Sequence, residues 1–323
     1  MKAIRYHRYG APHVLELEDL EMPVVKDDEI LVRVRAASVN PLDWHNMRGT
    51  PYVVRMMAGL RRPKFNGLAV DMAGAVEAVG KNVTAFAPGD EVFGWHKGTL
   101  AEYITVAENG VVLKKPGDLT FEQAASVPVA GLTALQGLRD KGRIEAGHKV
   151  LVNGAAGGVG TFAVQIAKAL GAEVTGVCGG GNVKMVESIG ADRVIDYTQE
   201  DYTRTDRRYD IVLDVAANRT LSESRRVLTH DGVLVGVGLA SPGMWIGPLL
   251  GPVKMLLLSR LVSQRFAPFL ARENRDDLAV LRDLLEAGKV TPVIDRTYTL
   301  SETPEAIGYL EEGHAKGKVV ITL

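Results

Sequence analysis

Glycines interrupt an apolar run between residues 150 and 172 in a pattern that can bind a phosphate group. The run reads VLVNGAAGGVGTFAVQIAKALGA, and the G-x-G-x-x-G template falls on Ala155, Gly157 and Gly160. A glycine at 157 lets a pyrophosphate approach the backbone, and Gly160 lets the following helix pack closely on the strand. Free N–H groups at the start of that helix then meet the anion. The pattern predicts a dinucleotide site, and the alternative is a tight turn that binds nothing.

The end of the next apolar segment decides which dinucleotide binds. An acidic side chain there accepts hydrogen bonds from the ribose hydroxyls of NAD and repels a 2′-phosphate, but residues 177–184 read VCGGGNVK. The glycines from Gly179 to Gly181 leave room for a 2′-phosphate, Asn182 can donate a hydrogen bond, and Lys184 can supply charge. We therefore expect NADPH as the cofactor. The alternative is a flexible glycine loop followed by a solvated lysine.

Short apolar segments recur about every twenty residues after this turn. They begin near residues 150, 173, 192, 209 and 232, and helical patterns lie between them. This alternation predicts βαβ units wound into a parallel sheet, an α/β fold with helices on both faces. Gly171 is expected to end the first helix in a left-handed conformation.

The N-terminal part has a different pattern. EILVRVRAASV, GAVEAVG and AEYITV are strand-like and are separated by turns rich in Gly, Pro and Asp. They predict an all-β, barrel-like module. Beyond about residue 270, two helical and two strand patterns remain. These are too few to form a core of their own, so we expect them to return to the N-terminal module.

Composition and charge exclude several classes of protein. The chain has 323 residues, 46% hydrophobic and 24% charged, which is typical of a globular enzyme of two domains. Lys plus Arg (38) nearly equals Asp plus Glu (39), so no positive field attracts nucleic acid. The single cysteine, Cys178, and an N-terminus without an apolar signal core predict a cytoplasmic protein. Residues 232–253 carry no charge, but six glycines and three prolines argue against a membrane span.

Seven segments resemble the medium-chain dehydrogenase/reductase superfamily and, within it, the quinone oxidoreductase branch. They are ASVNPLDW (37–44), DMAGAVEAVGKNVTAFAPGDEVFG (71–94), AEYITV (101–106), AASVPVAGLTALQGL (124–138), NGAAGGVG, GADRVIDY (190–197) and the ending GKVVITL. The resemblance covers nearly the whole chain. It implies a GroES-like β-barrel domain formed by residues 1–125 and 269–323, a doubly wound Rossmann domain formed by residues 126–268, and a cleft between them.

Zinc-dependent members of this superfamily hold a catalytic zinc with Cys, His and Cys. At those positions this sequence has Asn40, Val70 and Ala130, and one cysteine cannot make a four-cysteine structural site. Without a Lewis acid an alkoxide loses its stabilising group, whereas an acceptor with an electrophilic carbon needs less help. The resemblance therefore implies a zinc-independent, NADPH-dependent reductase of quinones or α,β-unsaturated carbonyls. The alternatives are an enoyl or alkenal reductase, and an NADPH-binding sensor or interaction protein with little turnover.

The resemblance also assigns residues to the site. Asn40 is expected to hydrogen-bond a carbonyl oxygen of the acceptor, Asp43 to orient a neighbouring side chain, and Tyr52 to be a candidate proton donor. The alternatives are simple turn formation by Asn40 and Asp43, and a structural role for Tyr52. The remaining expected cofactor contacts are Thr133 at the nicotinamide, Ala156, Gly157, Gly158 and Val159 at the pyrophosphate, Tyr197 at the adenosine phosphate end, Val215, Gly236, Val237 and Gly238 after later strands, and Lys318, whose alternative is a solvated charge.

Two segments, residues 44–70 and 232–272, are apolar and carry basic but no acidic side chains. They can admit an apolar acceptor or contact a membrane surface, and the alternative is ordinary packing under solvated arginines. The expected partner is a small, apolar, electrophilic acceptor, with no metal and no nucleic acid, and the resemblance implies a homodimer.

Overall fold

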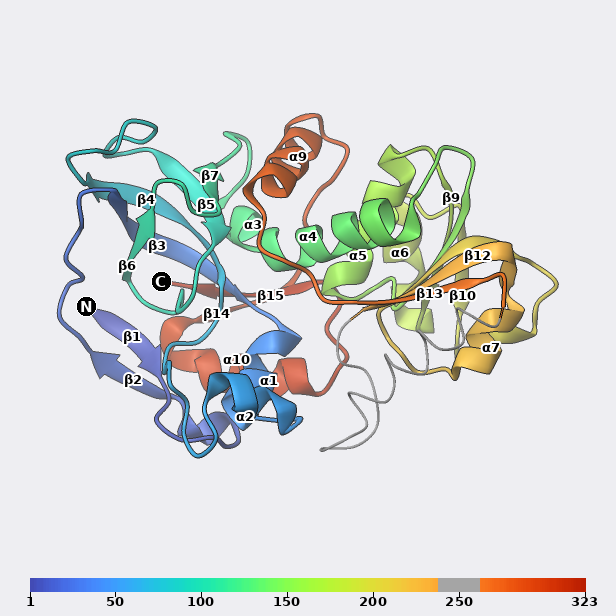
Figure 1. Ribbon diagram of the computed structural model, residues 1–323, viewed down its shortest axis with the longest axis horizontal. Helices are drawn as coiled ribbons and strands as arrows, with labels where there is room; N and C mark the ends of the chain where they lie inside the picture. The colour runs from blue at the N-terminus through green and yellow to red at the C-terminus, as the bar shows by residue number, and fades with distance from the viewer. Residues whose placement is uncertain (238–261) are drawn as a thin grey trace. The chain divides into compact units, whose positions relative to one another are not determined.

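The computed structural model describes residues 1–237 and 262–323, which form two compact units (Figure 1). The first unit consists of residues 1–129, 273–286 and 292–323. The second consists of residues 130–272 and 287–291. Each unit has its own sheet, and the chain leaves the first unit and later returns to it.

The first unit is built on a seven-stranded sheet with the order β14-β15-β3-β4-β5-β7, in which β6 pairs with β3. A separate hairpin pairs β1 with β2. The sequence predicted five of the nine strands described in this unit, β3, β4, β6, β14 and β15. The bounds of all nine strands are β1 Lys2–Arg5, β2 Glu16–Asp19, β3 Glu29–Val39, β4 Asp71–Val79, β5 Glu91–Trp95, β6 Tyr103–Ala107, β7 Val112–Lys114, β14 Ile294–Thr299 and β15 Lys318–Thr322.

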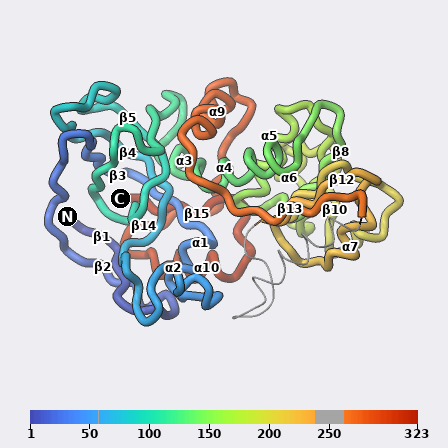
Figure 2. Tube along the Cα trace, viewed as in Figure 1, coloured from blue at the N-terminus to red at the C-terminus, as the bar shows by residue number. Residues whose placement is uncertain are grey.

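The expected return of the C-terminal segment to the N-terminal module is confirmed. Strand β15 runs antiparallel to β3, with Val319 opposite Val39, and parallel to β14. Figure 2 shows the last part of the chain passing beside β3. Val319 and Ile321 are fully buried in the same core cluster as Val39, so the last strand belongs to the interior of the first unit.

Helices also occur in the first unit, and the prediction of an all-β module was wrong in this respect. Helix α1 begins directly after Asn40, because Pro41 suits the first helical position and the Asp43 carboxylate accepts the Asn40 N–H group. The two helical patterns after residue 270 are confirmed as α9 and α10. The helices are α1 Pro41–Arg48, α2 Val53–Ala58, α3 Phe121–Ala125, α9 Arg275–Glu286 and α10 Thr303–Glu311.

The second unit contains a parallel six-stranded sheet with the order β10-β9-β8-β11-β12-β13. This confirms the predicted doubly wound sheet and adds β13, a short strand whose Pro268 suits its place at the sheet edge. The strand order reverses between β8 and β11, and ligands bind at such a reversal in open parallel sheets. The strands are β8 Lys149–Asn153, β9 Glu173–Cys178, β10 Arg193–Asp196, β11 Tyr209–Asp214, β12 Leu228–Val237 and β13 Arg265–Phe269.

Helix α5, Gly158–Ala169, follows β8 and is buried on all sides from Gly160 to Ala167. Gly171 has φ +84°, which confirms the predicted left-handed residue after this helix. The other helices of this part are α4 Pro128–Gln136, which crosses the boundary between the units, a π-helical turn at Gly137–Gly142, α6 Val183–Ser188 and α7 Leu221–Arg226. Within the described residues, no helix is long and apolar enough to span a membrane. Most of the uncharged segment 232–253 lies outside the described residues, as does Gly238.

Candidate functional site

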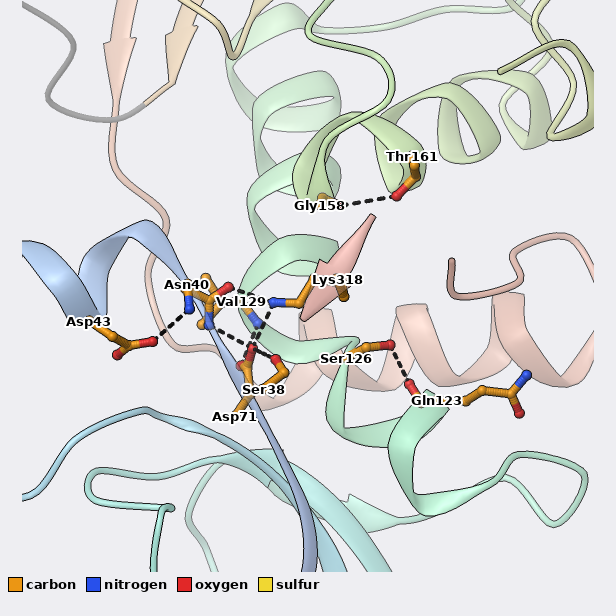
Figure 3. Close-up of polar contacts among 10 residues, drawn as sticks. All are labelled: Ser38, Asn40, Asp43, Asp71, Gln123, Ser126, Val129, Gly158, Thr161 and Lys318. Carbon is orange, nitrogen blue, oxygen red and sulfur yellow. Dashed lines mark hydrogen bonds and ion pairs between the residues drawn. The ribbon is translucent and has the colours of Figure 1, made fainter. Parts of the chain in front are cut away.

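Strand register brings a group of polar side chains together in the first unit. Ser38 lies opposite Asp71 on the neighbouring strand β4, and the pairing of Val319 with Val39 places Lys318 across from Asn40. Ser38 and Asn40 are two residues apart and therefore point to the same side of β3. Figure 3 shows these side chains converging. We call Ser38, Asn40, Asp43, Asp71 and Lys318 the Asn40 cluster.

Asp71 is the acceptor at the centre of the Asn40 cluster. Its Oδ2 accepts hydrogen bonds from Ser38 Oγ at 2.7 Å, Asn40 Nδ2 at 2.9 Å and Lys318 Nζ at 3.2 Å. Its Oδ1 accepts the backbone N–H of Val129 at 2.9 Å. Asp71 is fully buried and Lys318 is 2% exposed. A buried carboxylate and a buried ammonium are stable only when paired and hydrogen-bonded in this way.

Asp43 lies beside this ion pair and has an unusual environment. Its pKa is raised to about 7, mainly by burial and also by the neighbouring carboxylate of Asp71, although hydrogen bonds from the Asn40 and Ala69 backbone and the charge of Lys318 act to lower it. Its Oδ2 accepts the Asn40 N–H at 2.7 Å. Asp43 thus orients Asn40 through the backbone and can hold a proton near neutral pH.

Tyr52, the predicted proton donor, lies directly before α2 rather than on a strand of the cluster. The guanidinium of Arg55 stacks over its ring at 4.9 Å and over the ring of Tyr9 at 4.6 Å. Arg55 also donates to the backbone oxygens of Gly49 and Arg48. The contacts of Tyr52 therefore include a cation–π stack that fixes the segment between α1 and α2.

In the second unit, the turn between β8 and α5 has the geometry of a phosphate cradle. Gly154 has φ +90°, so the tight turn falls one residue before the position that the template predicted, Ala155. A Cβ atom added at Gly160 would lie 2.0 Å from the Gly154 oxygen, whereas one added at Gly157 would meet nothing closer than 3.5 Å. Gly160 is thus required by packing. Gly157 leaves open the space in which a pyrophosphate fits, at the N-terminus of α5.

The residues expected to contact the adenosine phosphate end of the cofactor follow the neighbouring strands β9 and β10. A Cβ at Gly179 would lie 3.2 Å from the Tyr197 hydroxyl, so the tyrosine covers this glycine. Asn182 directly precedes α6, and the exposed Lys184 lies in its first turn. A carboxylate is also present, because a Cβ at Gly180 would lie 2.5 Å from Asp196 Oδ2. The sequence between 177 and 184 lacks an acid, but the next strand, β10, supplies one.

A second polar network lies where the strand order of the second sheet reverses. Asn153 ends β8 and donates from Nδ2 to Asp214 Oδ1 at 2.7 Å and to Asn218 Oδ1 at 2.9 Å. Burial raises the pKa of Asp214, which ends β11. The backbone N–H of Val215, an expected cofactor contact, donates to the backbone oxygen of Asn153. Gly236 and Val237 end the next strand, β12, and Thr133 is buried in α4.

Sequence reasoning missed Ser38, Asp71, Asn153, Asp214 and Asn218. Asp71 and Asn153 stand inside quoted motifs, and each is a polar residue in a strand of otherwise apolar neighbours. That pattern was an available signal, because a buried polar side chain needs a specific partner. Lys318 was expected at the cofactor, and its hydrogen-bond acceptors in the first unit are Asn40 and Asp71.

Comparison with known proteins identifies relatives over the full chain. Family models described as "Alcohol dehydrogenase GroES-like domain" and "Zinc-binding dehydrogenase" match residues 26–117 and 189–321. The chain is 36% identical to "NAD(P)H oxidoreductase RTN4IP1, mitochondrial" of Mus musculus, across 98% of this chain and 87% of that protein. It is 33% identical to "Quinone oxidoreductase" of Homo sapiens, across 100% and 98%. The structure of Escherichia coli quinone oxidoreductase complexed with NADPH superimposes with a TM-score of 0.83, at 25% identity and full coverage of both chains.

The residues of the Asn40 cluster do not fit a bound zinc, although one family description reads "Zinc-binding dehydrogenase". Zinc binds thiolate, imidazole and carboxylate groups, and no three such side chains are grouped to hold a metal anywhere in residues 1–237 and 262–323. The Lys318 ammonium, 2.6 Å from Asn40 Oδ1, already places a positive charge beside Asn40. The turn at Gly157, in contrast, fits a dinucleotide.

Proposed function

Because this chain belongs to the medium-chain dehydrogenase/reductase superfamily, in its quinone oxidoreductase-like branch, we propose that it reduces quinones or α,β-unsaturated carbonyls with NADPH and without zinc. At the coarser level the chain is an NAD(P)H-dependent oxidoreductase of this family. The observation that carries the finer proposal is the set of polar side chains in the Asn40 cluster. They comprise an amide, two carboxyls, a hydroxyl and an ammonium.

The two units supply different parts of this chemistry. The bound NADPH would supply a hydride, and with one proton from solvent it would convert a quinone to a hydroquinone. In the second unit, Ala156, Gly157, Gly158 and Val159 would line the pyrophosphate at the start of α5, where free backbone N–H groups can meet it, although the Gly157 N–H is donated to the Gly154 oxygen. In the first unit, Asn40 donates a hydrogen bond to a carbonyl oxygen of the acceptor, and so stabilises negative charge that develops there.

The preference for NADPH rests on Asn182 and Lys184, which can bind a 2′-phosphate at the end of β9. The E. coli relative with 25% identity has a title that names NADPH. Asp196 opposes this preference, since its carboxylate lies beside Gly180 and repels a phosphate. We therefore propose that the ratio of NADPH to NADH affinity is set by Lys184 against Asp196.

An acceptor panel tests the proposal directly. Purified protein is mixed with NADPH and with benzoquinones, alkenals, enones, saturated aldehydes or simple ketones, and the fall in NADPH absorbance is followed. We expect turnover of the quinones or conjugated carbonyls, unchanged by prior dialysis against a zinc chelator. Loss of turnover on chelation would contradict the zinc-independent mechanism. Tight NADPH binding without turnover on any acceptor would favour the sensor.

The expected homodimer and cytoplasmic location stay predictions. The mouse relative is described as mitochondrial, so membership of the family does not fix the compartment. Light scattering of the purified protein and fractionation of cells test the two predictions separately.

A further inference from the structure

We propose that Lys318 is a positioning residue of the acceptor site, whose ammonium fixes the orientation of the Asn40 amide so that its N–H side faces a ligand. This inference rests on the proposed function, in which Asn40 contacts the acceptor. It names the chemistry that the site selects, which is a hydrogen-bond acceptor such as a carbonyl oxygen.

The position of Lys318 follows from the register of three adjacent strands. Lys318 begins β15, Asn40 directly follows β3, and Asp71 begins β4, which lies on the other side of β3. The antiparallel pairing of β15 with β3 brings the lysine across from Asn40, and that of β3 with β4 brings Asp71 opposite Ser38. The ammonium thus lies within hydrogen-bond distance of both Asn40 and Asp71 (Figure 3).

The chemistry of these two neighbours allows only one orientation of the Asn40 amide. An ammonium group can only donate hydrogen bonds, so the atom that faces Lys318 at 2.6 Å must be the amide oxygen. An ionised carboxylate can only accept, so the atom that faces Asp71 at 2.9 Å must be the amide nitrogen. A flipped amide would face an ammonium with N–H groups and a carboxylate with its oxygen, which leaves two buried contacts repulsive.

The locked amide keeps one N–H hydrogen on its nitrogen side. Lys318 donates to the amide oxygen and holds it on the lysine side, and Asp71 takes one of the two Nδ2 hydrogens. Among residues 1–237 and 262–323, no further acceptor lies within hydrogen-bond distance of that nitrogen. The remaining N–H is also polarised, because the carbonyl of the same amide accepts a charge-assisted hydrogen bond. A ligand that approaches the nitrogen side of Asn40 therefore meets a donor, which favours a carbonyl over a hydroxyl hydrogen.

The test compares Lys318→Met with Lys316→Met, which makes the same chemical change at an exposed lysine two residues away. Each protein is titrated with NADPH to count the sites that bind the cofactor. The KM for a benzoquinone is then measured, and kcat is calculated per competent site. We expect Lys318→Met to lower kcat/KM for the quinone by about 100-fold, the usual effect of a misplaced contact group. The NADPH Kd should stay within twofold of the wild-type value, and Lys316→Met should match the wild type in both quantities.

The conservative variant Lys318→Arg separates positioning from a structural role. Arginine keeps a cation with several N–H donors, so we expect it to recover a large part of the lost kcat/KM. A structural role alone would change the number of competent sites but would leave both the KM and the kcat per site unchanged. An NADPH Kd raised tenfold or more, with acceptor kinetics unchanged per site, would show that Lys318 binds the cofactor and would overturn the proposal. Unchanged kinetics would overturn it as well.

A double variant covers the case in which Lys318→Met does not fold. Removing one partner of a buried ion pair is strongly destabilising, whereas replacing both with neutral groups can be tolerated. Lys318→Met/Asp71→Asn leaves no buried charge unpaired and should show the same loss of kcat/KM. If neither variant folds, Lys318 is structural and the proposal is wrong. If the wild type reduces no acceptor, the proposed function is wrong. If the wild type reduces a quinone but Lys318→Met has unchanged kinetics, only the positioning role of Lys318 is wrong.

Discussion

At the scale of single residues, Asp43 is a carboxyl held away from solvent. Its carboxyl is buried beside Asp71, and its pKa is raised to about 7, mainly by burial. The folded state therefore binds a proton more tightly than the unfolded chain, in which the pKa is near its ordinary value of 3.8. By linkage, this group stabilises the fold most at low pH, and the contribution is lost as the pH rises toward 7.

The first prediction concerns this pH dependence. For Asp43→Asn, we expect the free energy of unfolding to change less between about pH 5 and pH 8 than it does in the wild type. The amide oxygen can still accept the Asn40 N–H group, but the side chain cannot ionise. Urea unfolding at the two pH values measures the difference. Asp118→Asn, at an exposed carboxyl, is the control, and a steeper pH dependence in Asp43→Asn would contradict the assignment.

The second prediction concerns Asp196 and the cofactor. Replacing it by Asn removes a negative charge beside Gly180 while keeping an acceptor for the Thr198 N–H group. We expect the ratio of NADH Kd to NADPH Kd to rise about tenfold, as a like-charge contact of roughly 1.4 kcal/mol is removed. Lys184→Ala should lower the same ratio. Fluorescence titration with both nucleotides measures the ratio. An unchanged ratio in both variants would show that the 2′-phosphate does not bind beside Asp196 and Lys184.

At the scale of elements, the contact between β8 and α5 determines whether the phosphate turn forms at all. A Cβ at Gly160 would lie 2.0 Å from the Gly154 oxygen and 2.7 Å from Ala155 Cα. Because backbone atoms cannot move aside cheaply, the helix would have to shift from the strand. Gly308, in contrast, lies inside α10, where an added Cβ meets no atom within 4 Å.

The third prediction compares the same substitution in these two helices. Gly160→Ala should destabilise the protein by about 2 kcal/mol, which is typical of overpacking against a fixed contact. Gly308→Ala should stabilise it by roughly 0.5–1 kcal/mol, because alanine loses less backbone entropy in a helix. Denaturant unfolding of both variants gives the two values. Equal changes in the two variants would contradict the close packing of α5 on β8.

Elements with a strong local pattern could be predicted from the sequence, and elements that depend on distant contacts could not. The strands of the second sheet alternate with helical patterns and were identified from these alone. Strand β13 was missed, because it is short and contains Pro268. Helix α1 was not predicted, and a turn at Asn40 and Asp43 was only the alternative to their expected roles in the site, because the hydrogen bond from the Asn40 N–H group to the Asp43 carboxylate is seen only in the structure.

At the scale of the whole molecule, the distinction between local pattern and distant contacts also separates the phosphate turn from the Asn40 cluster. The phosphate turn is formed by residues within one short segment, so their spacing was sufficient to predict it. The Asn40 cluster joins residues near 40, 71 and 318, and only strand register brings them together. Lys318 was therefore expected at the cofactor or in solvent. Its partner Asp71 was not assigned, because nothing local connects residues 247 positions apart.

The first unit depends on this long-range return of the chain. The last strand, β15, lies between β14 and β3 and carries Lys318 at its start. The second unit is formed mainly by one continuous stretch, residues 130–272. Cofactor binding by the second unit can therefore be changed at one position without disturbing the strands that assemble the Asn40 cluster.

The central claim is that a dinucleotide binds at the turn before α5, and NADPH affinity of Gly157→Val tests it most directly. Gly157 has φ −81° and ψ 175°, which valine adopts readily, and its Cβ would meet no atom closer than 3.5 Å. The variant should therefore fold with an unchanged melting temperature while its side chain fills the space of the pyrophosphate. We predict an NADPH Kd raised by about 100-fold or more, equivalent to roughly 2.8 kcal/mol. An NADPH Kd within twofold of the wild-type value in the folded variant would contradict the account.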